Sequence, residues 1–153
     1  YFPYIIETSI GVDRSLFAFL ADSYLEVKGG RTKTTKSSKE TEALLKLHKS
    51  LAPIKVAVLP LVKNKPKLVK KAKDVYKTLK SHFVCQYDEV GSIGRRYRRQ
   101  DEIGTLFCLT VDFDSLKQKD LTIRERDTMK QKRVKIKDLK ETIDKILRIR
   151  YKA

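Results

Sequence analysis

Two segments of the sequence carry side chains whose types and spacing could do chemistry. The first, IETSIGVDR, covers residues 6–14 and lies where an apolar run gives way to a helical pattern. Gly11 has no side chain, so a ligand could approach its backbone closely, and Arg14 falls in a first helical turn, where a guanidinium can meet phosphate oxygens. Glu7 and Ser9 lie beside the same junction, and a carboxylate there could hold an ammonium group. The alternative interpretation is an ordinary helix start with Arg14 in a surface ion pair.

The second segment, GRRYRRQDEIG, covers residues 94–104 and concentrates arginine around an aromatic side chain. Four arginines surround Tyr97 and are followed by Gln100, Asp101 and Glu102. Arginines with an aromatic suit phosphate contact and base stacking, whereas Gln, Asp and Glu can read base edges. A carboxylate can also accept a hydrogen bond from the amino group of cytosine, which a purely basic patch cannot do. The alternative is a solvated helix with intrahelical ion pairs.

The charge of the chain is strongly positive. Its 153 residues include 35 Lys and Arg against 19 Asp and Glu, a formal net charge of +16. Between Lys63 and Lys80, eight lysines are balanced only by Asp74. Such a field favours a polyanionic partner and makes its binding salt-dependent, although lysines spread over solvated faces would give the same composition. The hydrophobic fraction of 41% is enough for one ordinary core.

Several classes of protein are excluded by what the sequence contains. Two cysteines (Cys85 and Cys108) and two isolated histidines (His48 and His82) make neither a disulfide framework nor a zinc site, so metal catalysis is excluded. We expect both thiols to be reduced core residues of a cytosolic protein. No apolar run reaches the length of a membrane span, and the first residues lack the basic region of a signal peptide. Because the chain starts at Tyr1, we expect a fragment of a longer protein.

The apolar periodicity predicts an α/β fold, a mixed sheet of about five strands flanked by three helices and preceded by a strand and a helix. The strand at 105–113 is expected to be central, and strand–helix–strand spacing implies a right-handed parallel crossover. Residues 26–42 are rich in Gly, Ser, Thr and Lys and predict a linker, with a short helical turn at 42–51. The predicted strands are 1–7, 54–61, 83–88, 105–113 and a hairpin of 121–126 with 132–136; the predicted helices are 12–25, 66–79, 91–104 and one after residue 138.

Five segments, in order, resemble one family. IETSIGVDR resembles motif 3 of class II aminoacyl-tRNA synthetases in its glycyl form. The other four resemble the anticodon-binding domain of glycyl-tRNA synthetases: LAPIKVAVLPLVKN (51–64), YDEVGSIGRRYRRQDEIGT (87–105), TVDFD (110–114) and TIRERDTM (122–129). The resemblance implies a C-terminal fragment of such an enzyme. It divides the chain into the end of the catalytic domain (1–25), a basic linker (26–50) and the anticodon-binding domain (51–153).

The resemblance also implies roles for individual residues. The glycine-binding segment falls on Glu7, Thr8, Ser9, Ile10 and Gly11, with Glu7 placed for the amino group. The ATP-binding segment falls on Gly11, Val12, Asp13 and Arg14, with Arg14 on the phosphates or stacked against adenine. Anticodon recognition falls on Arg98, Arg99, Gln100, Asp101 and Glu102. The two carboxylates would accept from cytosine amino groups, and Arg98, Arg99 and Gln100 would hold the backbone or base edges.

The implied partners are glycine, ATP with magnesium, and glycine tRNA, in a cytoplasmic homodimer with no membrane association. Motifs 1 and 2 are missing, so we expect no catalytic residue in this chain and no activity from it alone. Three positions depart from the family pattern: Thr8 and Leu106 stand where Pro is expected, and Ile10 where Ala is expected. The bulk of Ile10 puts the shape of the glycine pocket in doubt. The alternatives are a free-standing RNA-binding accessory protein on the same fold and a generic basic scaffold.

Overall fold

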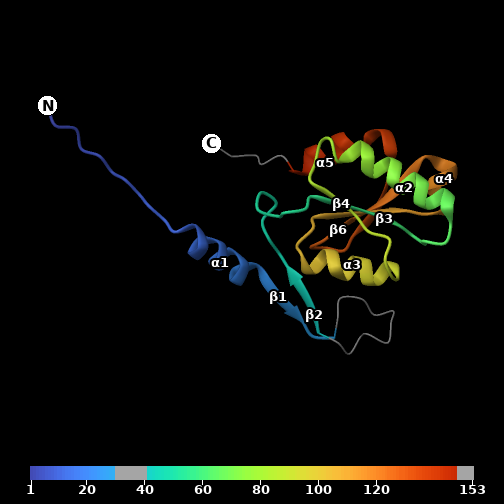
Figure 1. The fold of residues 1–153 in the computed structure, drawn as a ribbon, viewed down its shortest axis with the longest axis horizontal. Coiled ribbons are helices and arrows are strands. Elements are labelled where there is room, and N and C mark those ends of the chain that lie inside the picture. Colours follow the sequence, from blue (N-terminus) through green and yellow to red (C-terminus); the bar gives the residue numbers. More distant parts are fainter. Residues whose placement is uncertain (30–40, 148–153) are drawn as a thin grey trace.

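A computed structural model describes residues 1–29 and 41–147 and shows a mixed five-stranded sheet with helices on both faces (Figure 1). The strand order is β4-β3-β5-β6-β7, so β5 occupies the centre as predicted. The strands are β3 (Val56–Pro60), β4 (Cys85–Tyr87), β5 (Phe107–Val111), β6 (Asp120–Glu125) and β7 (Gln131–Lys135). The helices around them are α2 (Pro66–Leu79), α3 (Ile93–Glu102), α4 (Phe113–Gln118) and α5 (Leu139–Leu147).

The direction of each strand pair follows from the connection that joins it. β3 pairs in parallel with both β4 and β5, whereas β6 and β7 form the predicted antiparallel hairpin beside β5. Every residue of β3 and β5 is buried, which explains their nearly continuous apolar sequence. In β6, Leu121 and Ile123 lie in the core and Arg124 is buried as well, whereas β7 is mostly exposed.

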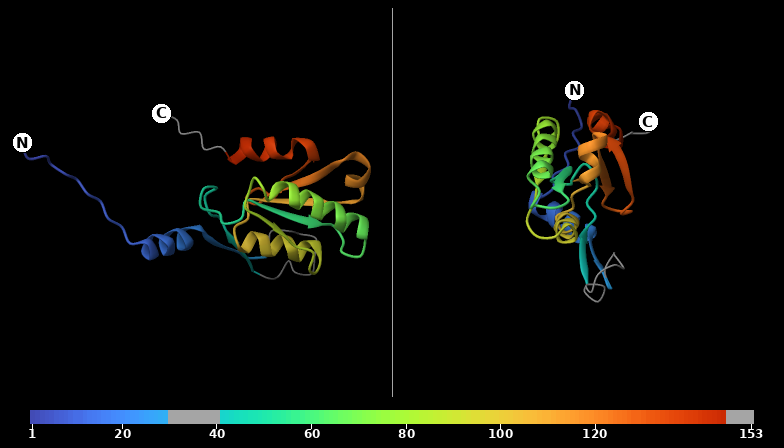
Figure 2. Two further views of the ribbon diagram at one scale, coloured as in Figure 1. Left: turned by 45° about the horizontal axis from the view of Figure 1, so that its top comes forward. Right: turned by 90° about the vertical axis from the view of Figure 1, so that its right-hand side faces the viewer.

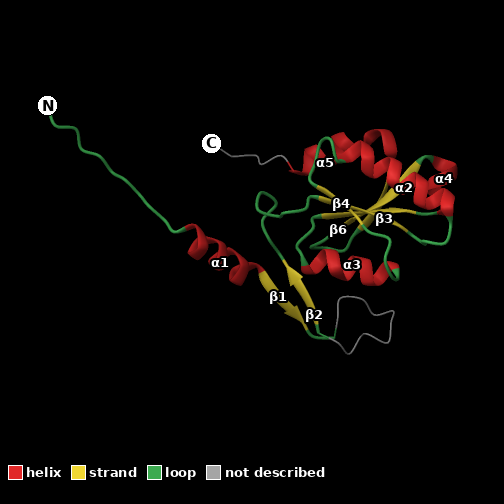
Figure 3. Ribbon diagram, viewed as in Figure 1, coloured by secondary structure: helices red, strands yellow, loops and turns green. Residues whose placement is uncertain are grey.

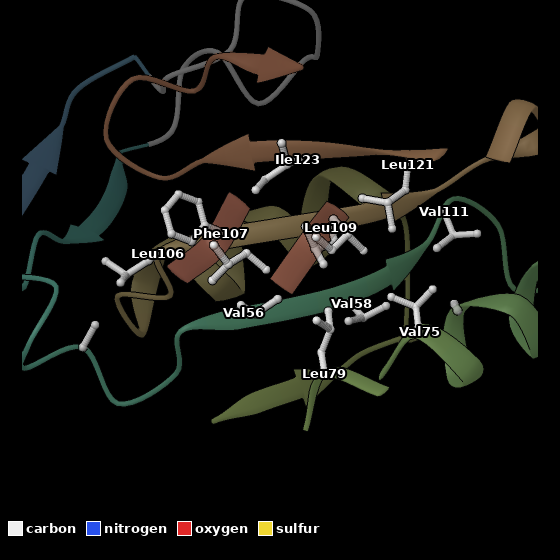
Figure 4. Close-up of a cluster of buried hydrophobic side chains, with 14 of the residues drawn as sticks. Val56, Val58, Val75, Leu79, Leu106, Phe107, Leu109, Val111, Leu121 and Ile123 are labelled. Carbon is white, nitrogen blue, oxygen red and sulfur yellow. The ribbon is translucent and has the colours of Figure 1, made fainter. Parts of the chain in front are cut away.

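The main hydrophobic core lies between the sheet and the layer formed by α2 and α5 (Figures 2 and 4). Val56, Val58 and Leu109 point into it from the sheet, and Leu68 and Ile143 enter from the two helices. α3 covers the opposite face, where a smaller cluster packs against the partly buried ring of its Tyr97. That smaller cluster consists of Ala57, Leu59 and Cys108.

The region before the sheet differs from the prediction. Residues 1–11 form no regular secondary structure, so the strand predicted at 1–7 does not form; no neighbouring strand is present to pair with its backbone (Figure 3). α1 (Val12–Ser23) follows, and then β1 (Tyr24–Val27) pairs in antiparallel fashion with β2 (Glu42–Leu45). Residues 42–45 of the helical turn predicted at 42–51 are therefore a strand, and only the end of that segment turns: the carbonyl of His48 accepts from the backbone N–H groups of Leu51 and Ala52 at 2.9 and 3.0 Å. The middle of the predicted linker, residues 30–40, lies outside the described residues.

α4 is a short helix that the sequence analysis did not predict. Asp112 caps it by accepting from the backbone N–H of Ser115 at 2.9 Å, and the Ser115 hydroxyl accepts from the Asp112 N–H at 3.1 Å. The helix ends at Lys119, whose φ is 54°. Its six residues are too few to show a helical period. Among the helices described, none is both long and apolar enough to cross a lipid bilayer.

Candidate functional site

The predicted glycine and ATP segment is exposed. Residues 1–14 are all exposed, and Gly11 forms the N-cap of α1, where its carbonyl accepts from the backbone N–H of Ser15 at 3.1 Å. A Cβ at Gly11 would meet no atom within 4 Å, so no close approach is made there within this chain. Glu7 and Arg14 lie on this exposed segment, and the described part of the chain gives them no pocket.

The exposed side of α3 carries three of the five residues predicted to bind an anticodon. Arg98 donates to the carboxylate of Glu42 on β2 at 3.1 Å. The guanidinium of Arg99 donates to Asp88, which follows β4, at 2.5 and 3.1 Å. Glu102 is exposed at the C-terminal end of the helix. These contacts fix the two arginines against neighbouring elements and leave parts of both side chains in solvent, with exposed fractions of 30% and 43%.

The other two predicted residues, Gln100 and Asp101, point inward. Gln100 is 1% exposed; its amide nitrogen donates to Gln86 at 3.1 Å, and its amide oxygen accepts from Thr105 at 2.7 Å. Asp101 is 6% exposed, and both of its oxygens accept from Arg124 at 2.8 and 2.9 Å. Both side chains therefore make their hydrogen bonds inside the domain, toward β4 and β6.

Arg124 lies at the centre of the contacts that hold α3 on the sheet. It is 3% exposed, and besides Asp101 it lies over the ring of Tyr97, 4.8 Å from the centroid. The Tyr97 hydroxyl is 2.5 Å from the hydroxyl of Thr110 on β5. Burial lowers the pKa of Arg124, but the hydrogen bonds that it donates to Asp101 outweigh that effect and the net pKa is raised. The contacts of Arg124 thus join β6 to α3.

A second polar group lies where β5 ends. Arg133 on β7 donates to Asp112 at 2.8 Å and to Asp120 at 2.5 Å. Burial raises the pKa of Asp112, but hydrogen bonds from Arg133 and Ser115 outweigh it, and the pKa falls to about 2. Next to Asp112, the side chain of Phe113 is 49% exposed. An exposed ring can stack on a planar group, and the fixed guanidinium and carboxylates that its sequence neighbour Asp112 belongs to can hydrogen-bond polar edges.

Chain topology explains why this edge is a candidate binding site. After β3 the chain crosses to β4 on one side, and after β5 it continues to β6 on the other side. In open α/β sheets, ligands bind outside the carboxyl ends of strands at the point where such connections diverge. The buried side chain of Arg96 connects the elements at this edge. It donates hydrogen bonds to the carbonyls of Pro60 at the end of β3 and of Gly91 before α3.

The sequence analysis missed Asp112, Phe113 and Arg133 as functional residues. The available signal was TVDFD, in which polar residues and an aromatic directly follow a fully buried strand. Arg133 is distant in sequence, and only the hairpin register, which pairs Thr122 with Arg133, brings it to this edge.

We predict a pH dependence for this group. Because the pKa of Asp112 is depressed in the folded chain, its stabilising contribution is present at neutral pH and is lost as the pH falls from about 4 toward 2. Replacing Arg133 with Gln should raise the pKa of Asp112 by about one unit or more and move the acid-induced loss of stability to higher pH. NMR titration of the Asp112 carboxyl measures this directly; an unchanged pKa would contradict the assignment.

The other groups that could be reactive are the two cysteines and side chains that could bind a metal ion. Cys85 and Cys108 are free thiols, and burial raises the pKa of Cys108 to about 12, so it is an unreactive core residue. Within residues 1–29 and 41–147, no group of three His, Cys, Asp or Glu side chains could hold a metal ion.

Comparison with known sequences finds a matching domain family and similar curated proteins. Residues 55–146 match the family described as the anticodon binding domain. The chain is 50% identical over 149 residues to the glycine–tRNA ligase of Clostridium perfringens, covering 96% of this chain and 30% of that protein. It is 51% identical over 154 residues to that of Caldanaerobacter subterraneus, covering 99% and 30%. The chain thus spans about 30% of the length of these curated relatives.

Solved structures share the fold. A prolyl-tRNA synthetase from Cryptosporidium parvum matches with a TM-score of 0.63 at 21% identity, over 67% of this chain and 22% of that one. The RNA binding domain of a threonyl-tRNA synthetase from the same organism matches with a TM-score of 0.59 at 24% identity, over 65% and 25%. These likenesses show the fold alone. The family match covers most of the chain, and the chain belongs to the anticodon-binding domain family.

Proposed function

We propose that this chain is the part of a glycine–tRNA ligase that reads the tRNA anticodon. The observation that carries the proposal is the end of β5, where Phe113 is exposed and its sequence neighbour Asp112 is held by Arg133, in a domain of the anticodon-binding family. The identity of about 50% to glycine–tRNA ligases supports glycine tRNA as the partner. The net charge of +16 supplies attraction to its phosphates.

Within this proposal the predicted anticodon residues divide into two groups. Arg98, Arg99 and Glu102 lie on the outer side of α3 and remain candidates for contact with RNA. Gln100 and Asp101 are positioning residues, because their hydrogen bonds are made inside the domain. Glu102 is then the exposed carboxylate of α3 available to a cytosine amino group.

The whole enzyme would join glycine to its tRNA by way of glycyl-adenylate, with ATP as substrate. We assign residues 1–25 to its catalytic domain and residues 51–153 to the anticodon-binding domain. Glu7 would hold the amino group of glycine, and Arg14 the phosphates of ATP. Magnesium would act together with ATP in the full-length enzyme. We further propose a cytoplasmic homodimer; the two free thiols suit a reducing compartment.

The decisive test compares two RNAs. Glycine tRNA and a mutant with both anticodon cytosines replaced are titrated with the 153-residue chain at two salt concentrations. We expect a preference for the cytosine-bearing tRNA that persists at the higher salt, because base contacts are less salt-dependent than phosphate contacts. Equal binding of both RNAs that disappears with salt would refute anticodon reading by this chain.

Phe113 provides a sharper prediction. Replacing it with Ala should weaken binding of the cognate tRNA between about 5-fold and about 100-fold, the range for loss of one stacked base. Leu116, which is also partly exposed on α4, gives the matched control: Leu116→Ala should leave the affinity nearly unchanged. Fluorescence anisotropy measures both. A Phe113 variant that binds like the Leu116 control would exclude stacking at this edge.

A free-standing accessory protein is the competing proposal. An accessory subunit has no obvious need for the segment from Glu7 to Arg14, which supports a true ligase. The parent reading frame distinguishes the two, since a ligase needs several hundred further residues carrying motifs 1 and 2. We expect no ATP–pyrophosphate exchange from the 153 residues alone.

A further inference from the structure

A surface pocket of about 450 Å³ lies on the side of the domain away from α3. Three elements form its walls: α2, the C-terminal end of α4, and the chain that leaves β7. Four of its six lining residues are lysines, and none is acidic. They are Lys71, Gln118, Lys119, Lys135, Ile136 and Lys137.

The four lysines of this pocket make no ion pair among the described residues: none of the pairs includes Lys71, Lys119, Lys135 or Lys137. Two carboxylates are near in sequence, since Asp74 lies one helical turn from Lys71 and Asp138 follows Lys137. The carboxylate next in sequence, Asp120, is held by Arg133 at 2.5 Å. Four ammonium groups around one concavity repel one another, and a bound anion relieves that repulsion.

A second depression of the surface shows the contrast. Lys140 and Lys145 line a pocket of about 380 Å³ together with Glu141 and Asp144. There Lys145 pairs with Glu141 at 2.8 Å, so the charges balance. The two pockets have similar volumes and different charge.

The backbone fixes two walls of the basic pocket together. Lys119 has φ 54°, a conformation that glycine adopts without strain and a lysine does not. Its carbonyl accepts from the backbone N–H of Ile136 at 3.0 Å. Lys119 and Lys137 therefore lie on segments that are hydrogen-bonded to each other, so the backbone positions of the two lysines are fixed relative to one another.

We propose that this pocket binds a phosphate group of the sugar–phosphate backbone of the tRNA. The proposal rests on the proposed function, because it takes the RNA read at the end of β5 as its ligand. Phe113 and Lys119 lie at opposite ends of α4, whose six residues span about 9 Å. An RNA strand that stacks a base on Phe113 brings its backbone within reach of the pocket. Lysine acts as a point charge toward phosphate, so this contact adds affinity without sequence preference.

The test compares two double variants of the 153-residue chain. Lys119→Gln with Lys135→Gln removes two charges from the basic pocket, and Lys140→Gln with Lys145→Gln removes two from the balanced one. Dissociation constants for glycine tRNA and for the anticodon mutant are measured over a series of salt concentrations. Circular dichroism confirms that both variants are folded.

We expect the basic-pocket variant to bind both RNAs about 5–20-fold more weakly at low salt, with the slope of log affinity against log salt reduced by about 1. The control should remain within about 2-fold of the unsubstituted chain. If both double variants behave alike, the pocket proposal is overturned while anticodon reading stands. Loss of discrimination between the two RNAs by the unsubstituted chain would instead overturn the proposed function. No RNA binding at all would overturn both.

Discussion

Replacing Arg124 with Met should lower the free energy of unfolding by about 3–5 kcal/mol, the usual result of removing one partner from a buried ion pair. Both oxygens of Asp101 accept from Arg124, and the two side chains are 3% and 6% exposed. The variant leaves the Asp101 carboxylate buried without its cation, and that desolvation is the main cost. Urea denaturation followed by circular dichroism measures the change.

A matched variant and a double variant make the result interpretable. Lys145→Met removes the cation of an exposed pair, whose side chains are 69% and 71% exposed, and should cost less than about 0.5 kcal/mol. Combining Arg124→Met with Asp101→Asn removes both charges and should be less destabilising than the sum of the single changes. A cost below about 1 kcal/mol for Arg124→Met would show that the pair does not hold α3 on the sheet.

Gly104→Ala should destabilise the chain by about 2–4 kcal/mol for two separate reasons. The φ of Gly104 is 80°, a conformation that strains any residue with a Cβ. A Cβ there would also lie 2.9 Å from the carbonyl oxygen of Leu45 and 3.4 Å from the side chain of Leu47. The end of β2 would have to move away from the end of α3.

Two other glycines separate these two causes. Gly91 has φ 79° and only side-chain atoms of Arg95 within 4 Å, so Gly91→Ala should cost about 1–2 kcal/mol from strain alone. Gly94 lies in α3, and a Cβ there would meet nothing within 4 Å. Gly94→Ala should stabilise the chain by up to about 1 kcal/mol, because Ala is the better helix former. Equal costs at Gly91 and Gly104 would mean that the contact with Leu45 is unimportant.

The strands of the sheet could be predicted from the sequence because differences in their burial leave different patterns of apolar residues. β3 and β5 appear as continuous apolar runs and the hairpin of β6 with β7 as alternating ones, so these strands and the central place of β5 followed from the pattern. The segment before the sheet was harder to predict. β1 and β2 pair across residues that lie outside the described ranges, and their pairing depends on distant packing against α3. Local composition carries no signal for such contacts.

The candidate site was predicted in outline and not in detail. The helix predicted at 91–104 forms as α3, Ile93–Glu102, and carries several arginines. The inward direction of Asp101 could not be foreseen, because its partner Arg124 is supplied by β6. The role of the edge at Phe113 likewise depends on a register that sequence spacing does not reveal.

Arg126 fixes the segment between β2 and the sheet to the rest of the domain. Its buried guanidinium donates to the carbonyl of Leu47 at 2.9 Å and to that of Gly104 at 3.0 Å. Nearby, the backbone N–H of Lys46 donates to the carbonyl of Ser23 at 2.7 Å. Hydrogen bonds thus hold the chain at successive points between the end of α1 and the sheet, so the β1–β2 pair is attached to the domain at more than one place.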